Sequence, residues 1–307
     1  MESPGAPVSA QQLGPYKLGL LLGEGGMGKV YRAFDDRLGR WVAAKRVRGE
    51  ATERGRARLL QEARTLARLG HPAIVQIFDV VEDAAGDWIV MELIEGPTLT
   101  ELMRDGPLEP SLVLDYGRQI ASALEAAHSL GVVHRDLKNE NVMALPSGYI
   151  KVLDFGLARR TTVRSAEDLP VGEGDGFADS LSRSGRVVGT PRAMSPEQAA
   201  GRRVDARSDL FALGTLLYEV LTGRSPFAAA NVAETLRRVQ LLEPPPVQQL
   251  RARVPGRLSQ LVERLLDKDP SRRPTSAGAV EAELTAIRVG QTLLGQRPGE
   301  SGADTPE

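Results

Sequence analysis

Residues 132–145 read VVHRDLKNENVMAL, and this stretch carries more information about fold and function than any other in the chain. Seven of the eight residues 134–141 are polar, and apolar runs lie on both sides. A His, an Arg, an Asp, a Lys and an Asn are among them: His134, Arg135, Asp136, Lys138 and Asn141. Such a cluster is either a charged loop between two strands or one half of a reaction site. The motifs on either side of it distinguish these two readings.

Downstream, the stretch KVLDFGLA (151–158) places Asp154 at the end of an apolar strand. A carboxylate at a strand end can hold a metal ion, and Asn141 and Asp154 both offer the hard oxygen ligands that Mg²⁺ prefers. Taken alone, the three letters DFG are common by chance and indicate only a turn.

Upstream, the stretch LGEGGMGKVYRA (22–33) spaces Gly23, Gly25 and Gly28 as G-x-G-x-x-G after a predicted strand. Glycines allow a backbone to approach phosphates closely because they lack Cβ. A glycine-rich hairpin turn would look much the same. A strand follows the glycines where a dinucleotide-binding motif has a helix, which argues against a Rossmann fold.

The next strand, VAAK (42–45), ends in Lys45. Strand alternation turns Lys45 to one face of the sheet, where a buried ammonium needs an anionic partner. A snorkelling edge lysine is the alternative. The helical stretch that follows (53–70) carries Glu62 among inward-facing leucines such as Leu66, so we expect Glu62 to face Lys45.

The chain divides into a strand-rich part and a helical part. Short strand patterns fill most of residues 16–90, with one amphipathic helix among them. From residue 110 onward the pattern favours amphipathic helices closed by Gly or Pro. We therefore expect a small sheet domain, a hinge near Ile94–Gly96 and a larger helical domain.

Composition excludes several classes of protein. The 307 residues include 39 basic and 40 acidic side chains, for a net charge of −1, which does not favour nucleic acid as a partner. No cysteine is present, so disulfides, thiolate metal sites and a cysteine nucleophile are excluded. Without a secretory signal or an apolar stretch long enough for a bilayer, the sequence predicts a cytoplasmic protein with no membrane span.

In this order and spacing, the four motifs resemble the signature set of the eukaryotic-type protein kinase family. GTPRAMSPEQ (189–198), SDLFALG (208–214) and DPSRRPT (269–275) extend the similarity, which is greatest to the bacterial serine/threonine branch. The resemblance implies an α+β, bilobal fold: a small antiparallel β-sheet lobe with one helix, and a larger, mainly α-helical lobe. It implies an N-lobe over 16–94 and a C-lobe over 95–289. The polar, Gly- and Pro-containing ends of the chain predict a disordered tail over 1–15 and a flexible tail over 290–307.

The resemblance also implies a function: transfer of the ATP γ-phosphoryl group to Ser or Thr hydroxyls of proteins, with Mg²⁺ or Mn²⁺. Asp136 and Lys138 take the catalytic positions, and Asn141 and Asp154 the metal positions. The implied nucleotide-binding residues are Leu22, Gly23, Glu24, Gly25, Gly26, Met27, Gly28, Val30, Ala43, Lys45, Glu62, Met91, Glu92, Ile94 and Met143. Met91 is the gatekeeper, Glu92–Ile94 the hinge, and Val30, Ala43 and Met143 enclose adenine.

Several structural roles follow from the same resemblance. Leu66, Ile77, His134 and Phe155 match an apolar column that links the lobes, so His134 is structural and not a base. Asp209 is expected to tether His134. Glu197 and Arg273 match a buried ion pair of the large lobe.

We also hypothesise phosphorylation of the activation loop, which by the resemblance runs from Asp154 to Glu197. Ser182 and Ser184 lie where family members carry activating phosphates, and Arg135 would order such a phosphate. Autophosphorylation in trans would require self-association. A solvated Ser/Arg-rich loop is the alternative.

The sequence departs from the family pattern at Asn139 for Pro, Ala193 for an aromatic residue and Ser195 for Ala. A pseudokinase scaffold or nucleotide-sensing module is the alternative function, but Lys45, Asp136 and Asp154 are all retained. A small-molecule kinase is a third possibility. The stretch GTPRAMSPEQ (189–198) counts against it, because it resembles the loop that the family uses to dock peptides; we call it the docking motif.

Overall fold

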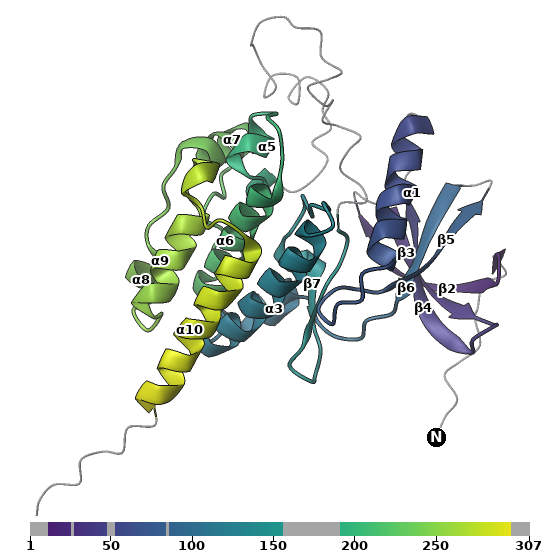
Figure 1. Cartoon of the computed structure of the whole chain (residues 1–307), viewed down its shortest axis with the longest axis horizontal. Coiled ribbons are helices and arrows are strands. Elements are labelled where there is room, and N and C mark those ends of the chain that lie inside the picture. Colours follow the sequence, from purple (N-terminus) through teal and green to yellow (C-terminus); the bar gives the residue numbers. More distant parts are fainter. Residues whose placement is uncertain (1–11, 26–27, 48–52, 84–85, 156–190, 296–307) are drawn as a thin grey trace, which may run out of the picture.

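The computed structural model describes residues 12–25, 28–47, 53–83, 86–155 and 191–295. Within these ranges a sheet-based lobe and a helical lobe lie side by side, joined by the segment that follows β6 (Figure 1). The expected α+β, two-lobed architecture is confirmed.

The small lobe is built on a six-stranded sheet with the order β1-β2-β3-β4-β6-β5. Every neighbouring pair in it is antiparallel. Helix α1 (Glu53–Ala67) lies beside the sheet and buries Leu60, Ala63 and Leu66 (Figure 1). The strands are β1 (Gln12–Leu13), β2 (Tyr16–Gly25), β3 (Gly28–Asp35), β4 (Arg40–Val47), β5 (Ile77–Asp83) and β6 (Gly86–Glu92).

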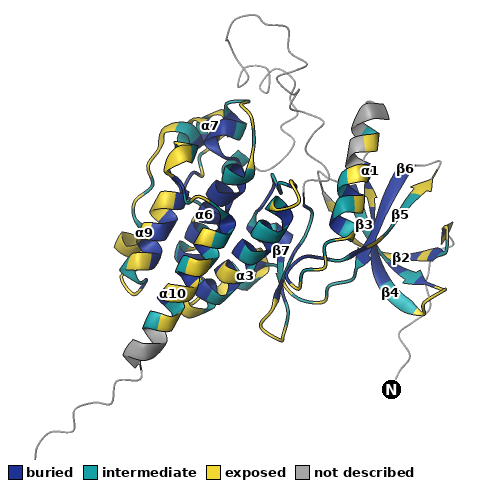
Figure 2. Cartoon of the chain, in the orientation of Figure 1, coloured by how far each residue is buried: buried dark blue, intermediate teal, exposed yellow. Residues whose placement is uncertain are grey.

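The large lobe is organised around α6 (Ala206–Thr222), most of whose side chains are buried (Figure 2). Asp205 caps its N-terminus, and Gly223, with φ 71°, ends it in the left-handed conformation that glycine adopts without strain. The other helices are α2 (Leu99–Leu102), α3 (Pro110–His128), α5 (Pro196–Ala199), α7 (Val232–Leu241), α8 (Val247–Leu250), α9 (Gly256–Leu265) and α10 (Ala277–Gly295). The short 3₁₀ helices are η1 (Met103–Asp105), η2 (Asn139–Asn141), η3 (Pro191–Ala193) and η4 (Pro270–Arg272).

One apolar core connects the two lobes. It extends from Ala43 and Met91 of the sheet through Phe155 to Phe211 and Leu213 of α6. A second cluster lies on the other face of the sheet, around Trp88. Because a single core crosses the interface, the small lobe is packed against the large one and not merely tethered to it.

Polar contacts reinforce the same junction. A two-stranded sheet of β7 (Val142–Ala144) and β8 (Ile150–Val152) lies between the lobes. The Val152 amide donates to the Ala73 carbonyl at 2.8 Å, and Lys151 Nζ donates to Glu92 Oε2 at 2.7 Å. These bonds fix the hinge relative to the strands that carry the site.

Two boundaries differ from the expected tails. Strand β1 lies inside the segment 1–15 that we expected to be disordered, because Gly14, with φ 54°, turns the chain back and buries Leu13. Helix α10 continues to Gly295, past the expected end at Val289. Among the described residues, no helix is long and apolar enough to cross a membrane.

Candidate active site

The loop of residues 129–138 connects α3 to η2 and β7, and Asp209 of α6 holds it in place. The backbone amides of His134 and Arg135 donate to the two Asp209 oxygens at 2.7 and 2.8 Å. His128 Nε2 lies 2.7 Å from the same carboxylate. The expected tether of His134 is confirmed, and it fixes Arg135 in a left-handed conformation with φ 65°.

Asp136 lies at the centre of the loop and is only 2% exposed. Lys138 Nζ is 3.0 Å from Asp136 Oδ2, and Asn141 Nδ2 donates to the Asp136 carbonyl at 2.8 Å. The sequence-predicted trio of Asp136, Lys138 and Asn141 is therefore in direct contact. Lys138 holds the Asp136 carboxylate and Asn141 holds the Asp136 backbone, so the carboxylate is oriented before any substrate arrives.

Asp154 is brought beside this trio through the backbone. The Leu153 amide donates to the Asn141 carbonyl at 2.8 Å, and a His134 ring nitrogen lies 2.9 Å from the Leu153 carbonyl. Asp154 itself has φ 59°, a left-handed conformation that is strained for a residue with Cβ. Asn141 and Asp154 thus lie on adjoining segments, and their side-chain oxygens could hold a divalent metal.

The expected ion pair between Lys45 and Glu62 is wrong for this structure. Lys45 Nζ pairs instead with Asp154 Oδ1 at 2.6 Å, and Glu62 Oε1 lies 3.8 Å from Arg135 Nη1. Lys45 does point inward, at 4% exposed, so the burial argument holds. The expected partner was wrong because the fold turns Asp154, and not Glu62, toward Lys45. Glu62 instead lies near Arg135 of the catalytic loop.

The residues expected around adenine come from both lobes. Val30 pairs with Lys45 and Ala43 with Met91 across neighbouring strands, which places their side chains on one face of the sheet. Met143 lies on β7 and forms an isolated bridge with Thr98, just after the hinge that contains Ile94. Of the glycine-loop residues, Gly26 and Met27 lie outside the described residues. Leu22, Gly23, Glu24 and Gly25 end β2, and Gly28 begins β3.

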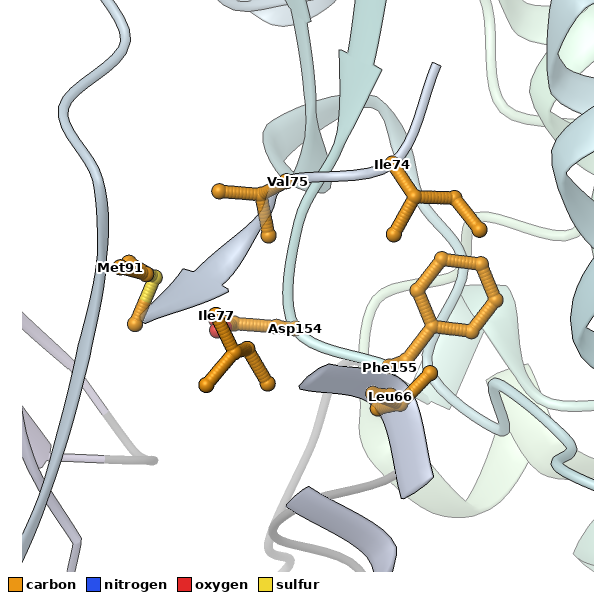
Figure 3. Close-up of a pocket in the computed structure, with 7 residues that line it drawn as sticks. All are labelled: Leu66, Ile74, Val75, Ile77, Met91, Asp154 and Phe155. Carbon is orange, nitrogen blue, oxygen red and sulfur yellow. The ribbon is translucent and has the colours of Figure 1, made fainter. Parts of the chain in front are cut away.

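Behind Met91 lies a small apolar cavity (Figure 3). Leu66, Ile77 and Phe155 line it, and the His134 ring packs against Phe155 with centroids 4.5 Å apart. The expected column of Leu66, Ile77, His134 and Phe155 is therefore continuous across the lobe interface, and His134 is a packing residue.

The docking motif is anchored to the large lobe by a buried ion pair. Arg273 donates to both oxygens of Glu197 at 2.8 and 2.9 Å, as expected. Burial alone would raise the pKa of Glu197, but the hydrogen bonds from Arg273 and Ser208 outweigh burial and lower it. Ser195, one of the departures from the family pattern, caps α5 through a reciprocal capping box with Gln198.

Sequence reasoning missed two contacts of this region. Gln198 Nε2 donates to the Arg135 carbonyl at 2.9 Å and so ties the docking motif to the catalytic loop. Arg192 Nη2 donates to Glu140 Oε1 at 3.0 Å. The opposite charges of Arg192 and Glu140 are visible in the sequence, but their 52-residue separation gives no signal of contact.

Comparisons with known proteins agree with this geometry. The family model described as protein kinase domain matches residues 16–285. The chain is 39% identical to the serine/threonine-protein kinase pkn3 of Myxococcus xanthus, over 93% of this chain and 52% of that protein. It is 40% identical to the serine/threonine-protein kinase PknD of Mycobacterium tuberculosis, over 97% of this chain and 44% of that protein.

The chain thus spans about half the length of these curated relatives. The crystal structure of the Mycobacterium tuberculosis PknI kinase domain is similar throughout, with a TM-score of 0.69 at 25% identity, covering 92% of this chain and 99% of that one. The chain belongs to the protein kinase family, as a serine/threonine protein kinase domain similar to those of bacteria.

Proposed function

We propose that this domain transfers the γ-phosphoryl group of ATP to serine and threonine hydroxyls of protein substrates, with the residue roles given below. The observation that carries the proposal is the contact of buried Asp136 with Lys138 and Asn141, beside the Lys45–Asp154 pair. A pseudokinase scaffold needs no such set of oriented charges.

In the reaction, the substrate hydroxyl oxygen attacks the γ-phosphorus and the bond to the bridging oxygen of ADP breaks. Asp136 orients the hydroxyl and accepts its proton, so the products are ADP, the phosphorylated residue and a protonated Asp136. Lys138, next to Asp136, offers a positive charge to the phosphoryl oxygens on which negative charge is concentrated. Much of the acceleration then comes from positioning and charge neutralisation.

The nucleotide would lie between the lobes. The glycine loop from Leu22 to Gly28 would cover the phosphates and Lys45 would bind them, while Val30, Ala43 and Met143 enclose the base. Met91 would close the back of the pocket, and backbone groups of Glu92–Ile94 would read the adenine edge. Once ATP is bound, Glu62 would pair with Lys45 and orient its ammonium group.

Asn141 and Asp154 fit Mg²⁺ by the chemistry of their donors. Asn141 commits its amide nitrogen to Asp136, which leaves its carbonyl oxygen for a cation, and Asp154 adds a carboxylate. The described residues contain no group of three or more His, Cys, Asp or Glu that could hold a metal. Mg²⁺ is held by one or two such oxygens together with substrate phosphates, where it neutralises phosphate charge, and Mn²⁺ would serve similarly.

Autophosphorylation is part of the proposal. A second copy of the chain would present its activation loop to Asp136, and a phosphate on Ser182 or Ser184 would be bound by Arg135. Ser182 and Ser184 lie outside the described residues.

The test is a transfer assay with labelled ATP and Mg²⁺ on three peptides that differ only in a central Ser, Thr or Tyr. We expect phosphate on the Ser and Thr peptides and little on the Tyr peptide. Lys45→Met should lower transfer by about 10²-fold or more, because it removes a phosphate-binding charge. The matched control is Lys17→Met, which removes an exposed lysine of β2 that pairs with Asp36. If wild type and Lys45→Met are equally inactive, the scaffold alternative is correct.

A further inference from the structure

The six lysines of the chain differ in how their positive charge is balanced. Five of them form an ion pair with a carboxylate: Lys17, Lys29, Lys45, Lys138 and Lys151. Lys268, in the segment between α9 and η4, forms no ion pair with a carboxylate of the described residues. Its charge is therefore balanced in another way.

Two phenyl rings and one carbonyl group hold the Lys268 ammonium group. Its Nζ lies 4.1 Å from the ring centroid of Phe227 and 5.2 Å from that of Phe211. The two rings are fully buried and stack with their centroids 5.6 Å apart. Nζ also donates to the Val239 carbonyl at 2.9 Å. The ammonium group thus lies against the apolar core of the large lobe, where aromatic faces take the place of a carboxylate.

These surroundings favour the neutral amine over the ammonium ion. Burial, and then the positive charge of Arg273, lowers the pKa of Lys268 to about 8. The carboxylates of Glu243 and Asp267 oppose this shift without cancelling it. At pH 8 about half of such an amine is unprotonated, against about 0.4% of a lysine with the usual pKa of about 10.4. A desolvated lysine close to a second cation is an activated nucleophile.

The same amine lies at the end of a helix. Val239 is in the last turn of α7, where carbonyl groups lack partners within the helix. A positive charge near a helix C-terminus is stabilising. Helix α7 packs against η3 and α5, which carry the docking motif. Loss of the Lys268 charge would therefore affect a helix that supports the docking motif.

We propose that Lys268 is a modification site, at which its amine accepts an acyl group from an activated donor such as an acyl phosphate. The unprotonated Nζ attacks the acyl carbon and forms a C–N bond, and the bond from that carbon to the phosphate oxygen breaks. Inorganic phosphate leaves, and the nitrogen releases its proton to water. The Lys268 side chain is partly exposed, so a small donor can reach it. This inference does not depend on the proposed function.

The experiment treats the full chain with acetyl phosphate, digests it with an arginine-specific protease and measures the acetylation rate of each lysine by mass spectrometry. At about pH 7.5 we expect Lys268 to react about tenfold faster than any of the other five lysines, because far more of its amine is unprotonated. Its rate should rise with pH and level off above about pH 9. The rate of an ordinary lysine continues to rise to about pH 10.

A charge variant tests the cause of this reactivity. Glu243→Gln removes a carboxylate that favours the charged form of Lys268, so it should raise the acetylation rate of Lys268 about twofold at about pH 7.5. Asp83→Asn is the matched control, because Asp83 is an exposed carboxylate of β5 in the small lobe. It should leave the rate at Lys268 unchanged.

A second measurement tests the consequence for α7. The amide that forms keeps one N–H for the Val239 carbonyl but carries no charge. Acetylation should therefore speed hydrogen exchange in the last turn of α7 by about threefold, as expected for loss of a cation at a helix C-terminus. Lys268→Arg keeps the charge and has no amine to acylate, so acetyl phosphate should leave its exchange rates unchanged.

Several results would contradict the inference. Lys268 would then react no faster than the other five lysines at about pH 7.5, or its rate would keep rising to about pH 10. An equal gain in Glu243→Gln and Asp83→Asn would show that local charge is not the cause. Unchanged exchange in α7 after acetylation of Lys268 would contradict the proposed consequence.

Discussion

Arg135 and Asp154 both adopt left-handed backbone conformations, with φ of 65° and 59°. Each such residue with a Cβ costs about 1–3 kcal/mol, and persists only where its surroundings fix it. The backbone amide of Arg135 donates to the Asp209 carboxylate, which fixes Arg135. The ion pair with Lys45 fixes the Asp154 carboxylate. The strain therefore lies at the two positions that aim the catalytic loop and the candidate metal ligand.

At the residue scale, the first prediction concerns Glu197. Glu197→Gln should lower the free energy of unfolding at neutral pH by about 3–5 kcal/mol, because it leaves the buried guanidinium of Arg273 without its counter-charge. Urea unfolding measures this change. Glu234→Gln is the control, since Glu234 is partly exposed and its pairs with the more exposed Arg237 and Arg238 should matter much less.

The same pair predicts a pH dependence. The pKa of Glu197 is lowered from its usual 4.5 in the folded protein, so its contribution is complete above pH 4.5 and is lost as the pH falls through the lower value. The stability difference between wild type and Glu197→Gln should therefore shrink below pH 4.5. A difference that grows on acidification would contradict this.

Which residues form the site was predictable, but not which of them pair. Asp136, Lys138 and Asn141 lie within six residues of one another, so one short loop had to bring them together. Lys45 could pair with either of two carboxylates, Glu62 or Asp154. Spacing in the sequence does not tell which of them the fold turns toward the lysine. Contacts between distant segments, such as Arg192 with Glu140, left no pattern in the sequence.

At the element scale, strands and helices with clear periodicity were predicted. The strands of residues 16–90, α1, and the long helices of the large lobe all lie where apolar spacing placed them. Strand β1 and the helices α5 and α8 were missed because two to four residues are too few to show a period. Their stability comes from pairing, caps and packing.

The second prediction concerns Gly96 of the hinge. The hinge passes so close to β7 that a Cβ at Gly96 would lie 2.1 Å from the Ala144 carbonyl oxygen. Gly96→Ala should therefore destabilise the protein by about 1–3 kcal/mol, since backbone has to move. Thermal unfolding measures it. Gly70→Ala, where a Cβ meets nothing within 4 Å, should be nearly neutral, and equal losses at both positions would contradict the account.

At the scale of the whole molecule, the lobes are joined by a continuous apolar core and by the Lys151–Glu92 pair. The ion pairs of the cleft, Lys45 with Asp154 and Glu62 with Arg135, also connect separate segments. In the proposed function ATP and Mg²⁺ would compete for Lys45 and Asp154, so nucleotide binding should exchange these partners.

We therefore expect a crystal structure with a non-hydrolysable ATP analogue and Mg²⁺ to show Lys45 paired with Glu62. Charge explains the exchange. The metal ion would neutralise the Asp154 carboxylate, and the phosphates would attract Lys45 away from Asp154. Glu62 would then leave Arg135. A nucleotide-bound structure in which Lys45 remains on Asp154 would contradict this prediction.

In the proposed reaction, Asp136 accepts the proton of the hydroxyl that attacks the γ-phosphorus. The most direct measurement is the single-turnover rate of transfer from ATP to a serine peptide, for wild type and for Asp136→Asn. Asp115→Asn is the matched control, because Asp115 pairs with Arg288 on the large lobe, away from the site. We predict a loss of at least about 10²-fold for Asp136→Asn, with unchanged ATP affinity and unfolding temperature. Equal rates in wild type and Asp136→Asn would contradict the account.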